Sequence, residues 1–147
     1  MTTHQPITIL LVEDDPGHAV LIEKNLRRAG ITQEIITVND GQSAVDVLHD
    51  RDSSQSDAHS DPVLILLDLN LPVLDGYQVL KTIKQNERSK RIPVIVLTTT
   101  DNPSEVTRCY ELGCNAYVTK PVEYEAFSKA IQNLGRLLSI IQVPNKA

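Results

Sequence analysis

The stretch VLILLD at residues 63–68 decides the fold of this chain. Five consecutive apolar residues, Val63–Leu67, are followed directly by Asp68. A strand that is apolar on both faces is buried on both, which is typical of a parallel sheet covered by helices. Such sheets bind ligands at the carboxyl ends of their strands. The stretch therefore predicts a central strand with Asp68 at the edge of a functional crevice.

Three other short apolar runs end on polar residues in the same way. They are Ile7–Val12 before Glu13 and Asp14, Pro93–Leu97 before Thr98, and Ala116–Thr119 before Lys120. Because the carboxyl ends of parallel strands meet at one edge of a sheet, we expect these side chains to gather around Asp68.

Helical patterns alternate with these strands. A further strand is predicted at Glu34–Val38, and helices are predicted from Pro16 to Gly30, around Ala44–Leu48, around Val79–Ile83, at Ser104–Leu112 and from Glu123 to Ile141. The polar segment Arg51–Asp61 is expected to be an exposed loop. The alternation predicts an α/β fold, a doubly wound five-stranded parallel sheet in the order 2-1-3-4-5, with an extended C-terminal helix. We expect one domain over residues 1–147, with its core at about 7–134 and an apolar extension at 135–147.

Composition argues against several functions. The 147 residues carry a formal net charge of -5, whereas nucleic-acid binders usually present a basic face. No apolar run is longer than five residues, so no membrane span and no signal peptide are expected, and we predict a cytoplasmic protein. Cys109 and Cys114 form no CxxC pair and are expected to be packing residues, and the four histidines show no zinc-ligand spacing.

The acidic residues at the strand ends suggest a metal site. Glu13, Asp14 and Asp68 would repel one another unless a cation lay between them. Oxygen ligands favour a hard ion such as Mg²⁺. Helix capping is the alternative for Asp14 or Asp15, but it does not explain Asp68.

Thr98 adds a hydroxyl group and Lys120 an ammonium group to the acids at the strand ends. Thr98 and Lys120 would each be unremarkable alone, since a lone threonine or lysine is usually structural. Beside an acidic crevice, Lys120 can pair with a carboxylate and later with a phosphoryl oxygen. The combination favours an aspartate that takes and loses a phosphoryl group on a divalent metal ion.

Four motifs together resemble a known family. They are LVEDD at 11–15, LLDLNLPVLDG at 66–76, PVIVLTT at 93–99 and YVTKP at 117–121. In order and spacing they resemble the response-regulator receiver domain of two-component signalling, over residues 7–134. The resemblance implies a flavodoxin-like phosphoacceptor domain that is not an enzyme and that is phosphorylated by a sensor histidine kinase.

The resemblance also implies roles for individual residues. Asp68 would be the phosphoacceptor, and the metal ligands would be Glu13, Asp14, Asp68 and the Asn70 backbone carbonyl. Thr98 and Tyr117 would be the switch residues, and Lys120 would be the lysine that the family has at this site. It further implies a cis peptide bond between Lys120 and Pro121. Glu13 departs from the aspartate that is commoner at its position.

The segment IKQNERSKRIPVIVLTT at 83–99 and the apolar tail are similar to the single-domain regulators of cyanobacterial phytochromes. This similarity implies a phytochrome-type histidine kinase as partner. The tail carries Leu137, Leu138, Ile140, Ile141 and Val143, and an exposed apolar patch often marks an interface.

Our hypothesis is a homodimer formed by the face of the fourth helix, fifth strand and fifth helix together with the C-terminal extension. Its interface residues would be Tyr117, Leu134, Leu137, Leu138 and Ile141. The alternative is that the tail folds back on its own core.

Two other functions remain open on the sequence. Small phosphatases of the haloacid-dehalogenase type also use an aspartate at a strand end, but their motif resembles DxDx[TV], and here Asp68 is followed by Leu-Asn-Leu-Pro without a second acid. A receiver-like adaptor that works without phosphorylation is the other alternative, and the intact set of acids, threonine and lysine argues against it.

Overall fold

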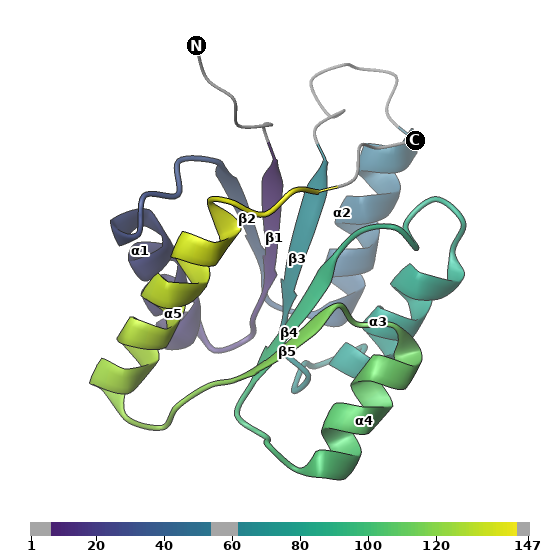
Figure 1. Ribbon diagram of the computed structural model, residues 1–147. Helices are drawn as coiled ribbons and strands as arrows, with labels where there is room; N and C mark the ends of the chain where they lie inside the picture. The colour runs from purple at the N-terminus through teal and green to yellow at the C-terminus, as the bar shows by residue number, and fades with distance from the viewer. Residues whose placement is uncertain (1–6, 54–61, 144–147) are drawn as a thin grey trace.

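The computed structural model describes residues 7–53 and 62–143. Its strands are β1 (Thr8–Val12), β2 (Glu34–Val38), β3 (Val63–Leu67), β4 (Val94–Thr98) and β5 (Ala116–Thr119). Its helices are α1 (Pro16–Arg28), α2 (Gly41–Ser53), α3 (Gly76–Gln85), α4 (Pro103–Leu112) and α5 (Tyr124–Leu138). The strands form one parallel sheet in the order β2-β1-β3-β4-β5, which confirms the predicted fold (Figure 1).

Helices cover both faces of this sheet. Helices α1 and α5 pack together on one face, and α2, α3 and α4 cover the other (Figure 1). The central strand β3 contributes to both layers, because Leu64 and Leu66 lie in the core cluster under α1 and α5, while Ile65 and Leu67 lie in the cluster under α2 to α4. This double burial is the reason why the run at 63–67 contains no polar residue.

The register of the sheet brings the strand ends level with one another. Val12 of β1 is paired with Leu67 of β3, and Leu67 is paired with Val96 of β4. The backbone N–H of Asp68 donates to the Val12 carbonyl at 3.0 Å, so the ladder continues one residue past the strand. Side chains that follow β1, β3 and β5 are therefore neighbours at one edge of the sheet.

Several predicted boundaries change in the structure. Arg51–Ser53, predicted to be loop, form the last turn of α2, since a polar composition alone does not distinguish a solvated helix turn from a loop; residues 54–61 lie outside the described part of the chain. Strand β4 includes Thr98, and α4 begins at Pro103 after an Asn102 cap. Cys109 and Cys114 are buried in the core, as expected of packing residues.

The C-terminal helix is shorter than predicted. It ends at Leu138, and Val143, five residues later, is buried in the core cluster under α1 and α5, to which Leu134 and Leu138 also belong. Val143 precedes Pro144, a position that disfavours the helical conformation. The burial of Val143 agrees with the alternative prediction, in which the tail folds back on its own core.

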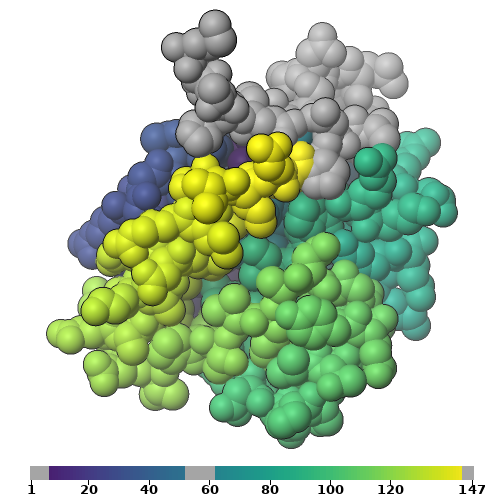
Figure 2. Space-filling view, viewed as in Figure 1, coloured from purple at the N-terminus to yellow at the C-terminus, as the bar shows by residue number. Residues whose placement is uncertain are grey.

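This packing corrects part of the dimer hypothesis. Leu134 and Leu138 recur at a spacing of four and face inward, so neither is an exposed interface residue. Leu137 and Ile141 are 52% and 39% exposed and remain on the surface, together with Ile140. Figure 2 shows this C-terminal segment, in yellow, on the surface in the upper part of the view, with α4, in green, in the lower part.

Gly76 allows the start of α3 to lie directly against Asp68 and Leu69, the residues that follow β3. A Cβ atom at Gly76 would lie 2.5 Å from both the Asp68 carbonyl oxygen and the Leu69 Cα atom. We expect Gly76→Ala to lower the free energy of unfolding by about 1 to 3 kcal/mol, the usual cost of overpacking. Urea denaturation measures this loss.

Gly17→Ala is the matched control, because its added methyl group would meet no backbone atom and only the end of the Asp15 side chain, at 3.2 Å. Equal stability of the two variants would contradict the close approach of α3 to Asp68.

Candidate functional site

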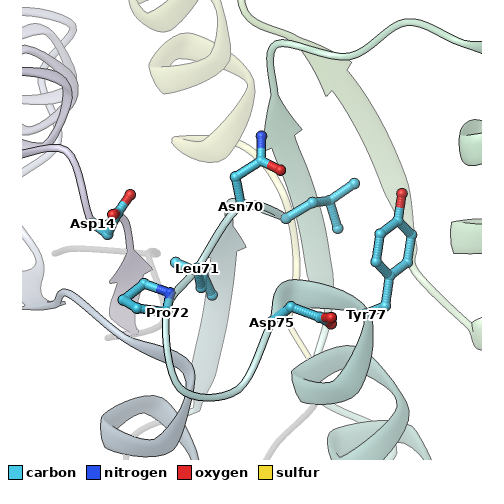
Figure 3. A pocket seen from close by; sticks show the side chains of 7 residues that line it. Asp14, Asn70, Leu71, Pro72, Asp75 and Tyr77 are labelled. Carbon is cyan, nitrogen blue, oxygen red and sulfur yellow. The ribbon is translucent and has the colours of Figure 1, made fainter.

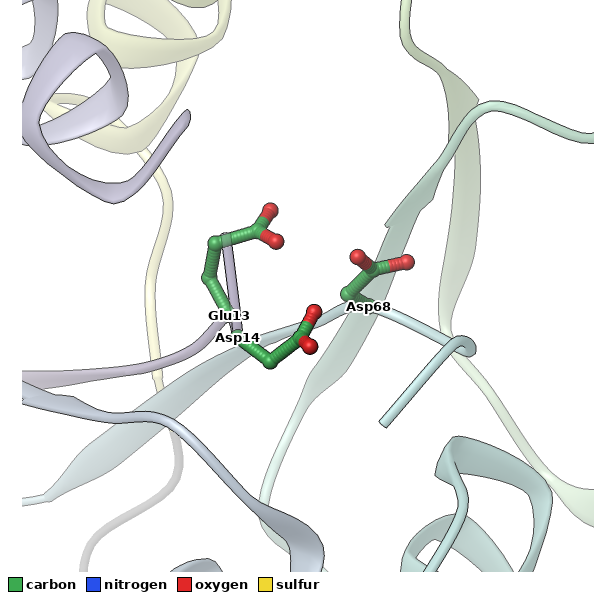
Figure 4. A group of neighbouring side chains, drawn as sticks. All are labelled: Glu13, Asp14 and Asp68. Carbon is green, nitrogen blue, oxygen red and sulfur yellow. The ribbon is translucent and has the colours of Figure 1, made fainter. Parts of the chain in front are cut away.

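The predicted side chains meet at the carboxyl edge of the sheet. Figure 4 shows the carboxylates of Glu13, Asp14 and Asp68 gathered beside one another. One carboxylate oxygen from each lies within 4.8 Å of the other two. The Lys120 Nζ atom lies 3.3 Å from Asp68 Oδ2 and also donates to Glu13 Oε1. Residues that are more than a hundred positions apart in the chain thus share one small volume.

Two acids and one lysine form a buried charge cluster. The side chains of Lys120 and Glu13 are each 1% exposed, and that of Asp68 is 9% exposed. Burial, with the neighbouring charge of Asp68, raises the pKa of Glu13 to about 7 against the opposing effect of Lys120. The cluster carries more negative than positive charge, and added positive charge would stabilise it.

Asp14 and Asp15 have different positions. Asp15 caps α1, since its Oδ1 atom accepts from the backbone N–H groups of Gly17 and His18 at 2.9 and 3.1 Å. Asp14 is exposed and turns its carboxylate toward Asp68 (Figure 4). The capping alternative therefore applies to Asp15, while Asp14 is available as a ligand.

A hollow of about 430 Å³ opens beside the acids. Its lining is formed by Asp14, Leu69, Asn70, Leu71, Pro72, Asp75 and Tyr77 (Figure 3). Asn70 is exposed at the mouth, and its backbone N–H lies 3.4 Å from Asp68 Oδ1. The metal ligands that Glu13, Asp14 and Asp68 offer beside this hollow are all carboxylate oxygens. Such ligands fit Mg²⁺, which also retains several of its water molecules.

The hydroxyl of Thr98 is unsatisfied. Thr98 is fully buried, and its Oγ1 atom has no hydrogen-bond partner in the described structure. Buried hydroxyl groups nearly always have a partner, and an unpaired one costs about 1 to 3 kcal/mol. Thr98 ends β4, the strand next to the one that Asp68 follows.

Tyr117 links β5 to the loop that follows Thr98. Its hydroxyl donates to the backbone carbonyl of Thr100 at 2.7 Å, and burial raises the pKa of this phenol to about 12. The ring is half-buried against the core cluster under α2 to α4. A shift of the loop at 98–100 would therefore act directly on Tyr117.

Two findings differ from the sequence analysis. The peptide bond between Lys120 and Pro121 is trans, the ordinary isomer, and not cis as the resemblance implied. His18, for which the sequence analysis predicts no role, lies with its Nδ1 atom 3.2 Å from Lys120 Nζ. Its place in the first turn after the acidic pair was the one signal of this contact in the sequence.

Comparison with known proteins assigns these features to one class, the phosphoacceptor domains of two-component signalling. The sequence model described as "Response regulator receiver domain" matches residues 9–132. The chain belongs to this family. Within the described residues, no helix has the length and apolar character needed to span a membrane.

The chain is similar to several response regulators of known sequence or structure. Response regulator Rcp1 of Synechocystis sp. (strain ATCC 27184 / PCC 6803 / Kazusa) is 41% identical over 132 residues, covering 90% of this chain and 88% of Rcp1. A receiver domain crystal structure from Rhodospirillum rubrum has a TM-score of 0.84 at 49% identity, covering 95% of this chain and 98% of that one. The phosphorylated cyanobacterial phytochrome response regulator RcpA has a TM-score of 0.83 at 36% identity, covering 97% and 100%. The resemblance to regulators of cyanobacterial phytochromes is thereby confirmed.

Metal binding can be tested through Asp14. With Mg²⁺ at about a hundred times its dissociation constant, we expect the free energy of unfolding of the wild type to rise by about 2 to 3 kcal/mol. Asp14→Asn should lose most of this gain, yet be at least as stable as the wild type without metal, because one of three crowded carboxylates is gone. Thermal unfolding with Mg²⁺ and with EDTA measures both effects.

The control is Asp15→Asn, which keeps a good helix cap and should keep the Mg²⁺ response. If the two variants respond to Mg²⁺ alike, Asp14 is not a ligand.

Proposed function

We propose that this protein is a response regulator that accepts a phosphoryl group from a histidine kinase on Asp68 and then reshapes one of its surfaces. The observation that carries the proposal is the buried Thr98 hydroxyl without a partner. It lies on the strand next to Asp68, whose carboxylate is already paired with Lys120. A phosphoryl group on Asp68 would offer oxygen acceptors to Thr98 and Lys120 together.

The acidic cluster would hold the metal ion. Glu13, Asp14, Asp68 and the Asn70 backbone carbonyl are the proposed ligands, with Glu13 acting through a water molecule. When bound, Mg²⁺ would supply positive charge to the phosphoryl oxygens. The manganese-bound form of Rcp1 has a TM-score of 0.82 to this chain at 39% identity, over 95% of this chain and 99% of that one, which supports a divalent ion here.

Transfer then follows from charge and position. An oxygen of Asp68 attacks the phosphorus atom of a phosphohistidine in line, the O–P bond forms, and the P–N bond breaks as the imidazole leaves with the electron pair. The Lys120 ammonium stabilises the charge on the equatorial oxygens. Its place beside Asp68 in the resting protein means that little rearrangement is needed. Later hydrolysis of the acyl phosphate returns Asp68 to its carboxylate.

The switch uses the same groups. The Thr98 hydroxyl moves toward a phosphoryl oxygen, which displaces the loop at 98–100 to which Tyr117 is hydrogen-bonded. Tyr117 then changes position on the surface formed by α4, β5 and α5. A change from mostly off to mostly on requires that phosphorylation favour the active state by about 5 kcal/mol.

The proposal also includes the compartment in which the protein acts and the kinase that phosphorylates it. Residues 1–147 act as one receiver domain in the cytoplasm, where a kinase has ATP, and the donor is a phytochrome-type sensor histidine kinase. Similarity to Rcp1 and to the phytochrome regulator RcpA over nearly their whole lengths supports this partner. The net charge of -5 agrees with an output that is a protein surface, without nucleic acid.

Phosphorylation of Asp68 can be tested without the kinase. After incubation with acetyl phosphate and Mg²⁺, we expect the intact mass to rise by one phosphoryl group, and borohydride trapping with peptide mass spectrometry should locate it at Asp68. Asp68→Asn should abolish the mass increase, because an amide cannot replace the carboxylate nucleophile.

Asp75→Asn is the control, since Asp75 lines the same hollow but serves as the cap of α3. Modification at another residue would contradict the proposal, and rapid turnover of small phosphate esters would instead support the phosphatase. An unchanged partner response in Asp68→Asn would support the adaptor.

We further propose that the phosphorylated protein forms a two-fold homodimer through α4, β5, α5 and the C-terminal segment. Tyr117 is half-buried on this face, and Leu137, Ile140 and Ile141 leave an exposed apolar strip at its end. Figure 1 shows α4 and α5 on either side of the edge strand β5. Burial of such a strip against a second copy would remove apolar surface from water.

The dimer is tested by analytical ultracentrifugation at micromolar concentration, before and after phosphorylation. We expect Leu137→Glu to weaken association at least about tenfold, since a charge would be buried in the apolar strip. Val122→Glu is the control, because Val122 is 98% exposed on the loop before α5 and away from the strip. A wild type that stays monomeric in both states would disprove the dimer.

A further inference from the structure

The Lys120 ammonium has three acceptors in the structure. They are Glu13 Oε1, Asp68 Oδ2 at 3.3 Å and His18 Nδ1 at 3.2 Å. A lysine ammonium carries three N–H donors and no acceptor. Every donor of this buried group is therefore matched by one acceptor, and the third acceptor is a residue with no assigned role in the proposed transfer.

The contact defines the tautomer of His18. Because the ammonium can only donate, Nδ1 must present its lone pair and the ring proton must be on Nε2. The Nε2 atom faces Asp15, whose Oδ2 atom lies 3.9 Å away, and this negative charge favours a proton on that side. Asp15 also caps α1 through its other oxygen, so its carboxylate is fixed in place.

The imidazole ring is held from the other side by α5. Its centroid lies 5.3 Å from that of Phe127, with a tilt of 39° between the ring planes. Phe127 is buried in the core cluster under α1 and α5 and is the only phenylalanine of the chain. His18 is thus oriented by α1 and by α5 while it contacts the residue at the end of β5.

We propose that His18 is a positioning residue that aims the Lys120 ammonium at the phosphoacceptor. His18 and Glu13 take two of the three N–H donors and so direct the third toward Asp68. When Asp68 carries a phosphoryl group, this third donor turns to a phosphoryl oxygen, while the other two keep their partners. The inference rests on the proposed function and adds to it a residue that touches neither the metal ligands nor the phosphoryl group.

Packing alone would also explain a half-buried histidine, and the two roles differ in what substitution does. His18→Leu keeps a similar volume but removes the acceptor. His18→Asn keeps an acceptor in the right place, because its amide oxygen branches from the same carbon as Nδ1. His18→Gln places its oxygen one bond further out, near the position of Nε2, and should not replace the contact.

The first test measures the rate of phosphorylation by acetyl phosphate in these variants. We expect His18→Leu and His18→Gln to be slower by about tenfold, the effect of losing one hydrogen bond to a charged group. His18→Asn should lie within about threefold of the wild type on the same grounds. The Mg²⁺ concentration for half-maximal rate should not change, because His18 acts through Lys120.

Three outcomes of this test would each overturn the proposal. The first is a His18→Leu variant that is phosphorylated as fast as the wild type. The second is a His18→Asn variant that is as slow as His18→Leu. The third is recovery of the rate of His18→Leu with excess Mg²⁺, which would mean that the substitution acts through the metal site.

The second test needs no reaction. Nitrogen-detected NMR of the unphosphorylated wild type should show the His18 ring protonated at Nε2, with Nδ1 in the shift range of a hydrogen-bonded acceptor. Lys120→Met, which removes the donor, should move the Nδ1 signal toward that of a free imidazole. An Nδ1–H tautomer in the wild type would disprove the contact.

The two tests separate the inference from the function on which it rests. If wild type is not phosphorylated at Asp68, the proposed function fails whatever the NMR result. If wild type is phosphorylated and the His18 variants behave alike, only the role of His18 fails.

Discussion

The buried ion cluster of Lys120 with Glu13 and Asp68 is the interaction on which the rest of the site depends. A charge this deep is tolerated only with partners, and Lys120 has them because the parallel sheet brings the carboxyl ends of β1, β3 and β5 to the same edge, with β4 between β3 and β5. Without the ammonium, the crowded carboxylates would repel one another more strongly. Burial, with the charge of Asp68, raises the pKa of Glu13. The carboxylates of Glu13 and Asp68 outnumber the single ammonium of Lys120, so a divalent cation at this edge would be stabilised by them.

In the proposed switch, phosphorylation of Asp68 would give the buried Thr98 hydroxyl a partner that it lacks in the described structure. An unpaired buried hydroxyl costs about 1 to 3 kcal/mol, which is a large part of the roughly 5 kcal/mol that a two-state switch requires. The link from Thr98 through the Thr100 carbonyl to the Tyr117 hydroxyl runs from the site to the α4–β5–α5 surface. In the proposed switch, a change of charge at Asp68 would therefore act on this surface.

The C-terminal segment shows how burial divides a single apolar run. Leu134, Leu138 and Val143 complete the core under α1 and α5, so their contribution is to the stability of the domain itself. Leu137, Ile140 and Ile141 lie between them in sequence but point outward. Residues 134–143 thus combine side chains that pack in the core with apolar side chains that remain exposed.

The sequence by itself determined the sheet, its order and the meeting of Asp14, Asp68, Thr98 and Lys120, because the apolar runs are continuous where strands are buried on both faces and each run ends on a polar residue. It could not determine the last turn of α2 at Arg51–Ser53, the end of α5, or the inward face of Leu134 and Leu138, since these depend on which surfaces meet. Only the tertiary structure decided that Asp15 caps α1, that the Thr98 hydroxyl is unpaired, and that His18 reaches Lys120. The physical reason is that strand order follows from short-range patterns of burial, whereas a hydrogen bond between residues 102 positions apart exists only once the two helices and the strand are packed.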